Sequence, residues 1–127
     1  MNIAIVLTMT ALRVGEDKLA LNRVVTFVEA PKNEKDNLDF FYKHIDCDTM
    51  DGVYFDGYDF FVDDNGLLRS DSVVCEYNGV PLAGNIVVTA GCDSVGKTLW
   101  FDDVRDAKKV LEIKELLETA EFKGLVR

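Results

Sequence analysis

The chain begins with two long runs of β-branched and apolar residues that a short polar segment separates. NIAIVLTMTALRV spans residues 2–14 and KLALNRVVTFVEA spans residues 18–30, with Gly15, Glu16 and Asp17 between them. Branched and aromatic side chains favour extended strands, and a glycine-bearing polar turn between two such runs predicts a hairpin. We therefore expect two long antiparallel strands, which commit the chain to a sheet.

A helix is predicted directly after this hairpin. In PKNEKDNLDFFYKHI, Leu38, Phe41 and Ile45 recur at helical spacing. Asn33 or Asp36 is available as the N-cap, and acidic residues lie near the positive end of the helix dipole.

From Val53 onward the pattern returns to that of strands. Three dipeptides that favour tight turns, Asp-Gly at 56–57 and Asn-Gly at 65–66 and 78–79, divide this part of the chain. The expected strands are YDFFV, SVVCEY, VPLAG running into NIVVTA, and TLWF. A β-meander is the simplest arrangement of these strands.

The C-terminal segment DDVRDAKKVLEIKELLETAEF predicts a final helix. Asp102 or Asp103 is its expected N-cap, and Asp106 lies in its first turn. The apolar stripe of this helix consists of Ala107, Val110, Ile113, Leu117 and Ala120. The predicted fold is α+β, with a mostly antiparallel sheet (N-terminal hairpin plus meander) packed against two helices in a single domain, residues 1–127.

The charge balance restricts the partners of the chain. Its 14 basic and 23 acidic residues give a formal net charge of −9, and we find no segregated basic patch. Such a surface repels phosphate backbones and anionic lipids, so direct nucleic-acid binding and membrane association are disfavoured. The three cysteines are odd in number and widely spaced, and no membrane span or basic leader is evident. We expect a cytoplasmic protein.

GCDSVGKT, residues 91–98, matches the phosphate-loop pattern GxxxxGK[ST], with Gly91, Gly96, Lys97 and Thr98 at the defining positions. A phosphate loop needs a helix directly after it, whereas Thr98 is followed by the strand-like LWF and then by aspartates that start the final helix. The meander offers no parallel βαβ units, and Asp93 would repel a bound triphosphate. Phosphate binding is therefore the disfavoured alternative, and a glycine-rich turn between two strands is the expected structure.

The densest polar feature of the chain is an acidic segment without lysine or arginine between Lys43 and Arg69. Its aspartates are Asp46, Asp48, Asp51, Asp56, Asp59, Asp63 and Asp64. The start DCDTMDG resembles a calcium loop, but its glycine comes one place late and Gly57 occupies the position of the bidentate glutamate. Turn aspartates bonded to their own backbone are one interpretation of this segment. The other is an acidic recognition surface that engages a basic protein face or mimics the charge of nucleic acid.

No residue set marks a metal centre or a catalytic site. A zinc site would have to assemble from His44, Cys47, Cys75 and Cys92, which are scattered along the sequence. A reactive thiolate beside His44 is disfavoured in strongly acidic surroundings. We expect no catalytic residues, no metal and no cofactor, and hence no enzyme.

The stretch DGYDFFVDDNGLLRSDSVVCEYNGVPLAGNIVVTA, followed by a turn and TLWFDDVRDAKKVL, resembles the family of small bacterial and phage proteins known as domain of unknown function 3846. The likeness covers about residues 36–115. It includes the acidic-glycine turn at 64–66, the Ala83-Gly84 step that opens a strand, and the acidic start of the last helix at Asp102 and Asp103. GCDSVGKT falls on the family's variable turn. The chain departs from the family in its longer N-terminal hairpin and in SVVCEYNGVP, where the family has an asparagine-bearing segment.

This resemblance implies a context rather than a chemistry. Such genes look like accessory genes of phages and mobile elements, and the family offers no catalytic residues to transfer. The expected function is that of a non-catalytic accessory or anti-defence protein, which binds and modulates a host or defence protein through its acidic surface in the host cytoplasm. The alternative is a small-ligand or nucleotide-binding, sponge-like protein, for which a homo-oligomer could close the pocket.

Overall fold

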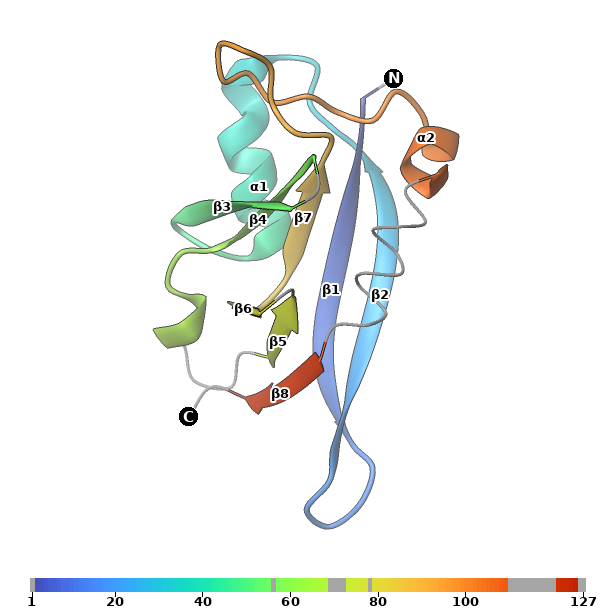
Figure 1. The fold of residues 1–127 in the computed structure, drawn as a ribbon, viewed down its shortest axis with the longest axis vertical. Coiled ribbons are helices and arrows are strands. Elements are labelled where there is room, and N and C mark those ends of the chain that lie inside the picture. Colours follow the sequence, from blue (N-terminus) through green and yellow to red (C-terminus); the bar gives the residue numbers. More distant parts are fainter. Residues whose placement is uncertain (1, 56, 69–72, 78, 110–120, 126–127) are drawn as a thin grey trace.

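The computed structural model describes residues 2–55, 57–68, 73–77, 79–109 and 121–125. Their elements, in chain order, are β1 (Ile3–Arg13), β2 (Leu19–Glu29), η1 (Glu34–Asp36), α1 (Asn37–Ile45), β3 (Met50–Phe55), β4 (Tyr58–Asp63), η2 (Gly66–Leu68), β5 (Val73–Tyr77), β6 (Val80–Ala83), β7 (Ile86–Thr89), α2 (Val104–Lys109) and β8 (Glu121–Leu125). The predicted α+β class with a mostly antiparallel sheet is confirmed (Figure 1).

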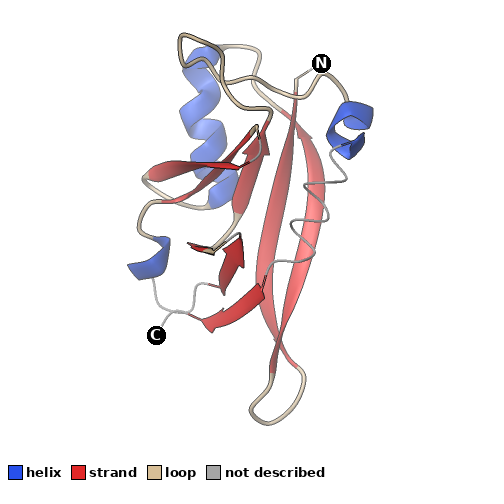
Figure 2. Ribbon diagram, in the orientation of Figure 1, coloured by secondary structure: helices blue, strands red, loops and turns tan. Residues whose placement is uncertain are grey.

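The strands form two sheets. The main sheet has five strands in the order β2-β1-β7-β4-β3, and a smaller sheet has the order β6-β5-β8. Helix α1 covers one face of the main sheet, and the small sheet lies against the other face (Figure 2). The result is a layered arrangement in which the central strands of the main sheet are buried from both sides.

The predicted N-terminal hairpin is confirmed. β1 and β2 pair antiparallel from Ile3 opposite Glu29 to Arg13 opposite Leu19 without a break in register. At the turn, the amide of Val14 donates to the carbonyl of Lys18 at 3.0 Å. The polar residues 15–17 therefore lie in the loop, as the sequence indicates.

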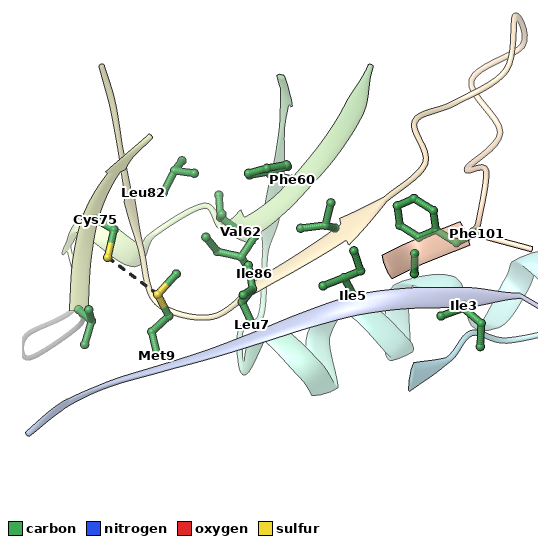
Figure 3. Packing of buried hydrophobic residues seen from close by; sticks show 13 residues of the cluster. Ile3, Ile5, Leu7, Met9, Phe60, Val62, Cys75, Leu82, Ile86 and Phe101 are labelled. Atoms are coloured by element: carbon green, nitrogen blue, oxygen red, sulfur yellow. Dashed lines mark hydrogen bonds between the residues drawn. The ribbon is translucent and has the colours of Figure 1, made fainter. Parts of the chain in front are cut away.

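Two hydrophobic clusters use the alternating side chains of β1. Ile3, Ile5, Leu7 and Met9 face the small sheet, whereas Ala4 and Val6 face α1. Phe60, Ile86 and Val88 join the first cluster from β4 and β7, together with Cys75 and Leu82 from the small sheet (Figure 3). Thus the core forms because strand side chains alternate, which buries both faces of one sheet.

Helix α1 follows the prediction only in part. Phe41 and Ile45 are buried against the sheet, but Leu38 is 53% exposed, so the predicted stripe is wrong at its first position. Asp36 and Asn33 stand at the N-caps of α1 and η1, and neither side chain makes a capping hydrogen bond. Tertiary packing therefore holds this helix, which is usual for a helix of this length.

The chain path after α1 differs from a simple meander. β3–β4 and β5–β6 are hairpins, but β7 lies between β1 and β4, so NIVVTA does not continue VPLAG in one sheet. Gly84, with φ +86°, separates the two strands. The predicted TLWF strand is wrong: the segment forms isolated bridges from Thr98 to Cys92 and from Phe101 to Ile3, and the backbone of Leu99 bonds to residues 90 and 91, but no strand results. Trp100 instead stacks on Phe41 of α1, with ring centroids 5.7 Å apart.

Helix α2 begins where the sequence predicts. The carboxylate of Asp103 accepts the amide of Asp106 at 2.7 Å, which makes Asp103 the N-cap, and Asp106 lies in the first turn. Ala107 is buried in the core. The other members of the predicted stripe, at 110, 113, 117 and 120, lie outside the described residues. The predicted end of the helix is wrong, because Glu121 and Phe122 belong to strand β8, where they pair with β5 of the small sheet.

Candidate functional site

The predicted acidic surface is divided by the fold. Asp46 ends α1 in the left-handed conformation, with φ 62°, and is exposed, as is Asp48. Residues paired across β3 and β4 share a face of the sheet, so Asp51 lies with Val62 on the face opposite α1. Asp59 and Asp63, at odd positions of β4, lie on the α1 face. Asp56 lies outside the described residues. The aspartates therefore do not form one continuous surface.

Three of these aspartates border an open hollow of about 180 Å³, which we call the acidic groove. It lies where β6 passes the end of the β3–β4 hairpin, next to η2. The groove is lined by Asp51, Val53, Val62, Asp63, Asp64, Leu67, Val80, Pro81, Leu82 and Ala83. Its lining is thus aliphatic, with carboxylates as the charged groups.

The three aspartates that border the groove have different surroundings. Asp63 is buried, and its carboxylate accepts the amide of Asn65 at 2.9 Å, so it orders the turn after β4. Asp51 and Asp64 are exposed. The amide of Asp64 donates to the carbonyl of Thr49 at 3.1 Å, and the side-chain amide of Asn65 donates to the hydroxyl of Thr49 at 3.1 Å. The turn that carries Asp64 is therefore anchored on the residue preceding β3.

The close approach of η2 to β6 fixes one end of the groove. A Cβ atom built on Gly66 would lie 2.8 Å from the carbonyl oxygen of Ala83 and 3.2 Å from its Cβ. Gly66 is buried and belongs to the Asn-Gly pair that the sequence marked as a turn. Glycine is required here because the two backbones lie closer than a side chain allows.

Such a groove has the chemistry to hold a cationic side chain. The aliphatic residues can cover the methylene stem of a lysine or arginine, while Asp51 and Asp64 can pair with its charged end. Burying a methylene contributes about 0.8 kcal/mol, whereas an exposed ion pair contributes about 0.2–1 kcal/mol. The apolar lining would therefore supply most of the affinity, and the carboxylates would supply charge selectivity.

Asp59 lies apart from the groove, opposite Tyr54 on β3 and Thr89 on β7. Burial raises the pKa of its carboxyl group above the ordinary 3.8. The hydroxyl oxygen of Thr89 is buried without a hydrogen-bond partner among the described residues. This part of the predicted acidic surface is a partly desolvated patch of the sheet and does not belong to the groove.

The loop that carries the phosphate pattern is closed by its own aspartate. The carboxylate of Asp93 accepts the amides of Val95 at 3.0 Å and Lys97 at 2.9 Å. The amide of Gly96 donates to the carbonyl of Asp93, and Gly91 and Gly96 have φ of +97° and +83°. These loop amides already have an acceptor, and Thr98 forms a bridge with Cys92 instead of opening a helix. The glycine-rich turn is confirmed as the local structure.

The four residues considered for zinc do not gather at one place, and His44 lies in the last turn of α1 against the Phe40 ring, with ring centroids 4.6 Å apart. Cys47 is buried beside α1, Cys75 is buried between the two sheets, and Cys92 is exposed on the loop. Burial raises the pKa of the Cys75 thiol, and this effect exceeds the lowering of the pKa by the positive charge of Arg23. The thiol contacts the sulfur of Met9 at 3.9 Å. In the ranges that the structure describes, no group of three His, Cys, Asp or Glu side chains gathers as metal ligands would. None of the helices in these ranges is long and apolar enough to span a membrane.

The chain was also compared with protein-family models, with curated proteins and with solved structures, and none of the three comparisons gave a match.

Sequence reasoning identified the aspartates of the groove but not the groove. Its aliphatic side comes largely from Val80–Ala83 and Leu67, which are separated from Asp51 by many residues. The sequence signal for their proximity is the pair of Asn-Gly turns at 65–66 and 78–79, because each tight turn reverses the direction of the chain.

Proposed function

We propose that the chain is a non-catalytic binding protein whose acidic groove receives a lysine or arginine side chain from a basic surface of a partner protein. The observation that carries this proposal is the combination of exposed Asp51 and Asp64 with an aliphatic lining in one open hollow. The proposal keeps the expectation of an accessory protein of phage or mobile-element origin that modulates a host or defence protein. It assigns the contact to two aspartates instead of seven.

The charge of the whole chain supports the same kind of partner. A net charge of −9 attracts a basic protein surface over a distance of about one Debye length, roughly 8 Å at physiological salt. Such attraction mainly accelerates encounter, while the buried methylene stem sets the lifetime of the complex.

No feature of the described residues favours the small-ligand alternative. The hollow, at about 180 Å³, is smaller than the roughly 300–1,000 Å³ that is usual for pockets that enclose a small molecule. The amides of Val95 and Lys97 in the glycine loop are bonded to Asp93 and are not directed at a vacant anion site. We therefore retain protein binding as the single proposed function.

The test is a titration of isotope-labelled protein with a short arginine-bearing peptide, followed by amide NMR. We expect the amides of Gly52, Leu67 and Leu82 to shift, and an Asp51→Asn/Asp64→Asn double variant to lose this response. The matched control is Asp46→Asn/Asp48→Asn, which removes the same charge away from the groove and should keep the response. Capture of a host protein that the control retains and the groove variant loses would extend the result to a natural partner. Shifts of equal size in both variants, or no shifts in the wild type, would contradict the proposal.

A further inference from the structure

β2 is a long edge strand of the main sheet. It has eleven residues, it pairs with β1 along its whole length, and among the described residues it forms no ladder on its other side. Its sequence, LALNRVVTFVE, contains neither proline nor lysine, and its register shows no bulge. Natural sheets usually protect an exposed edge with one of these devices, because an open edge pairs with other chains.

Other edges in the same protein do carry such protection. β3, the opposite edge of the main sheet, has six residues and includes Asp51 and Gly52. β6, an edge of the small sheet, has four residues and includes Pro81. Within the described ranges, β2 is therefore longer than the edge strands β3 and β6 and lacks the proline and the short length that protect them.

The middle of β2 is apolar and exposed on both faces of the sheet. Val24 and Val25, whose side chains point in opposite directions, are 50% and 39% exposed. A strand that covers this edge would shield both valines as well as the open backbone groups.

The hydrogen bonds of the hairpin show which backbone groups of β2 point outward. The amide of Val14 donates to the carbonyl of Lys18, and the amide of Ala30 donates to the carbonyl of Asn2. In an antiparallel pair, bonded and non-bonded residue pairs alternate, so the even-numbered residues of β2 bond to β1. The amides and carbonyls of odd-numbered residues, including Arg23, Val25, Phe27 and Glu29, therefore point to the open edge.

We propose that β2 pairs antiparallel with β2 of a second copy of the chain, about a two-fold axis that passes beside Thr26. In this register Arg23 lies opposite Glu29 of the second copy, and Val25 lies opposite its Phe27. All four are odd-numbered residues whose backbone groups point outward, so the ladder can form. The two charged residues of the strand thus neutralise each other twice, once at each end of the interface.

Charge selects this register over its neighbours. Moving the axis to Val25 would place Arg23 opposite Phe27, and moving it to Phe27 would place Glu29 opposite Val25. Arg23 and Glu29 lie on the same face of the sheet, because both are odd-numbered residues of β2. An opposite charge directly across the strands is favourable and like charges are unfavourable. The strand is therefore self-complementary in one register.

This interface is separate from the acidic groove, because β2 and the β3–β4 hairpin lie at opposite edges of the main sheet. The dimer could exist whether or not the groove binds a basic side chain. A strand-to-strand contact is small, so we expect dimerisation that depends on protein concentration.

The test is sedimentation of the full chain at concentrations up to about 1 mM, so that a dimer with a dissociation constant below this value is detected. We expect a monomer–dimer equilibrium in the wild type. Arg23→Glu and Glu29→Arg should each weaken the dimer about tenfold or more, because each places like charges at both ends of the interface. The double variant Arg23→Glu/Glu29→Arg should recover the wild-type dissociation constant.

The control is Arg13→Glu, which makes the same charge change on β1, away from the proposed contact, and should leave the dimer unchanged. Circular dichroism of each variant establishes that it folds, and amide exchange of Val25 and Phe27 should slow as the wild-type concentration rises. A wild type that stays monomeric would overturn the proposal, even if the edge accepts a strand from another protein. The proposed register would be overturned if the single charge-reversal variants dimerise as tightly as the wild type. It would also be overturned if the double variant does not recover the wild-type dissociation constant.

Discussion

Replacing Asp93 with alanine should destabilise the glycine-rich loop, although phosphate-loop reasoning would assign the key role to Lys97. The carboxylate of Asp93 accepts two backbone amides, those of Val95 and Lys97, as a helix N-cap does. Loss of a capping side chain of this kind costs about 0.5–2 kcal/mol. Because both amides are on exposed residues, water can replace part of the loss, and we expect about 1 kcal/mol. The melting temperature should fall by about 2–8 °C.

Urea unfolding followed by the fluorescence of Trp100, the single tryptophan, measures this change close to the loop. Asp93→Asn keeps one acceptor oxygen and should lose less than Asp93→Ala. Lys97→Ala, the matched control, should remain within about 0.5 kcal/mol of the wild type, since Lys97 is exposed and contributes only its backbone. The reasoning fails if Asp93→Ala has the same free energy of unfolding as the wild type. It also fails if Lys97→Ala lowers the free energy of unfolding as much as Asp93→Ala does. It also fails if inorganic phosphate raises the wild-type melting temperature and Lys97→Ala removes that rise.

Three further predictions concern packing and ionisation. Gly66→Ala should lower the free energy of unfolding by about 1–3 kcal/mol, because its Cβ would meet the Ala83 carbonyl at 2.8 Å; wild-type stability in urea would contradict this. Burial, and then the charge of Lys43, lower the pKa of His44 below 6.5, so its NMR titration should lie below that value and rise in Lys43→Ala. The unfolded chain therefore binds a proton at His44 more tightly than the folded chain does. As a result, the free energy of unfolding should decrease as the pH falls below about 6.5. Burial raises the pKa of Asp59 above 3.8, so its ionisation lowers the free energy of unfolding as the pH rises. Asp59→Asn should therefore unfold at a higher urea concentration than the wild type at pH 7, and this difference should disappear below pH 3.8. Urea titrations at both pH values measure it.

The sequence predicts those parts of the fold that local rules determine. The hairpin follows from the alternation in β1 and β2 and from the polar turn, and Asp103 is a recognisable N-cap for α2. TLWF misled the prediction because Trp100 packs on α1, a contact that apolar character alone does not distinguish from a strand. β3 was missed because its MDGVYF sequence is that of an exposed edge, where neither an apolar face nor alternation is required.

The arrangement of the strands and the groove could not be predicted in the same way. That β7 pairs with β1 and β4 depends on contacts between distant segments, which no local pattern encodes. The acidic segment was recognised, yet only the pairing of β3 with β4 decides that Asp51 and Asp59 face opposite sides of the sheet. The acidic groove then requires β6 to lie beside them, which is again a long-range arrangement.

The position of β7 has a consequence for the chain during its synthesis. β1 and β4 can pair with β7 only when residues 86–89 have left the ribosome, although the hairpin partner of β1 is complete at Glu29. At roughly 5–20 residues per second, the inner edge of β1 waits on the order of 3–12 s for its neighbour. During that time adjacent nascent chains on one messenger expose the same apolar edge to each other. Premature termination before Ile86 would therefore be especially harmful, because it would release a chain in which β1 and β4 lack the central strand that pairs with both of them.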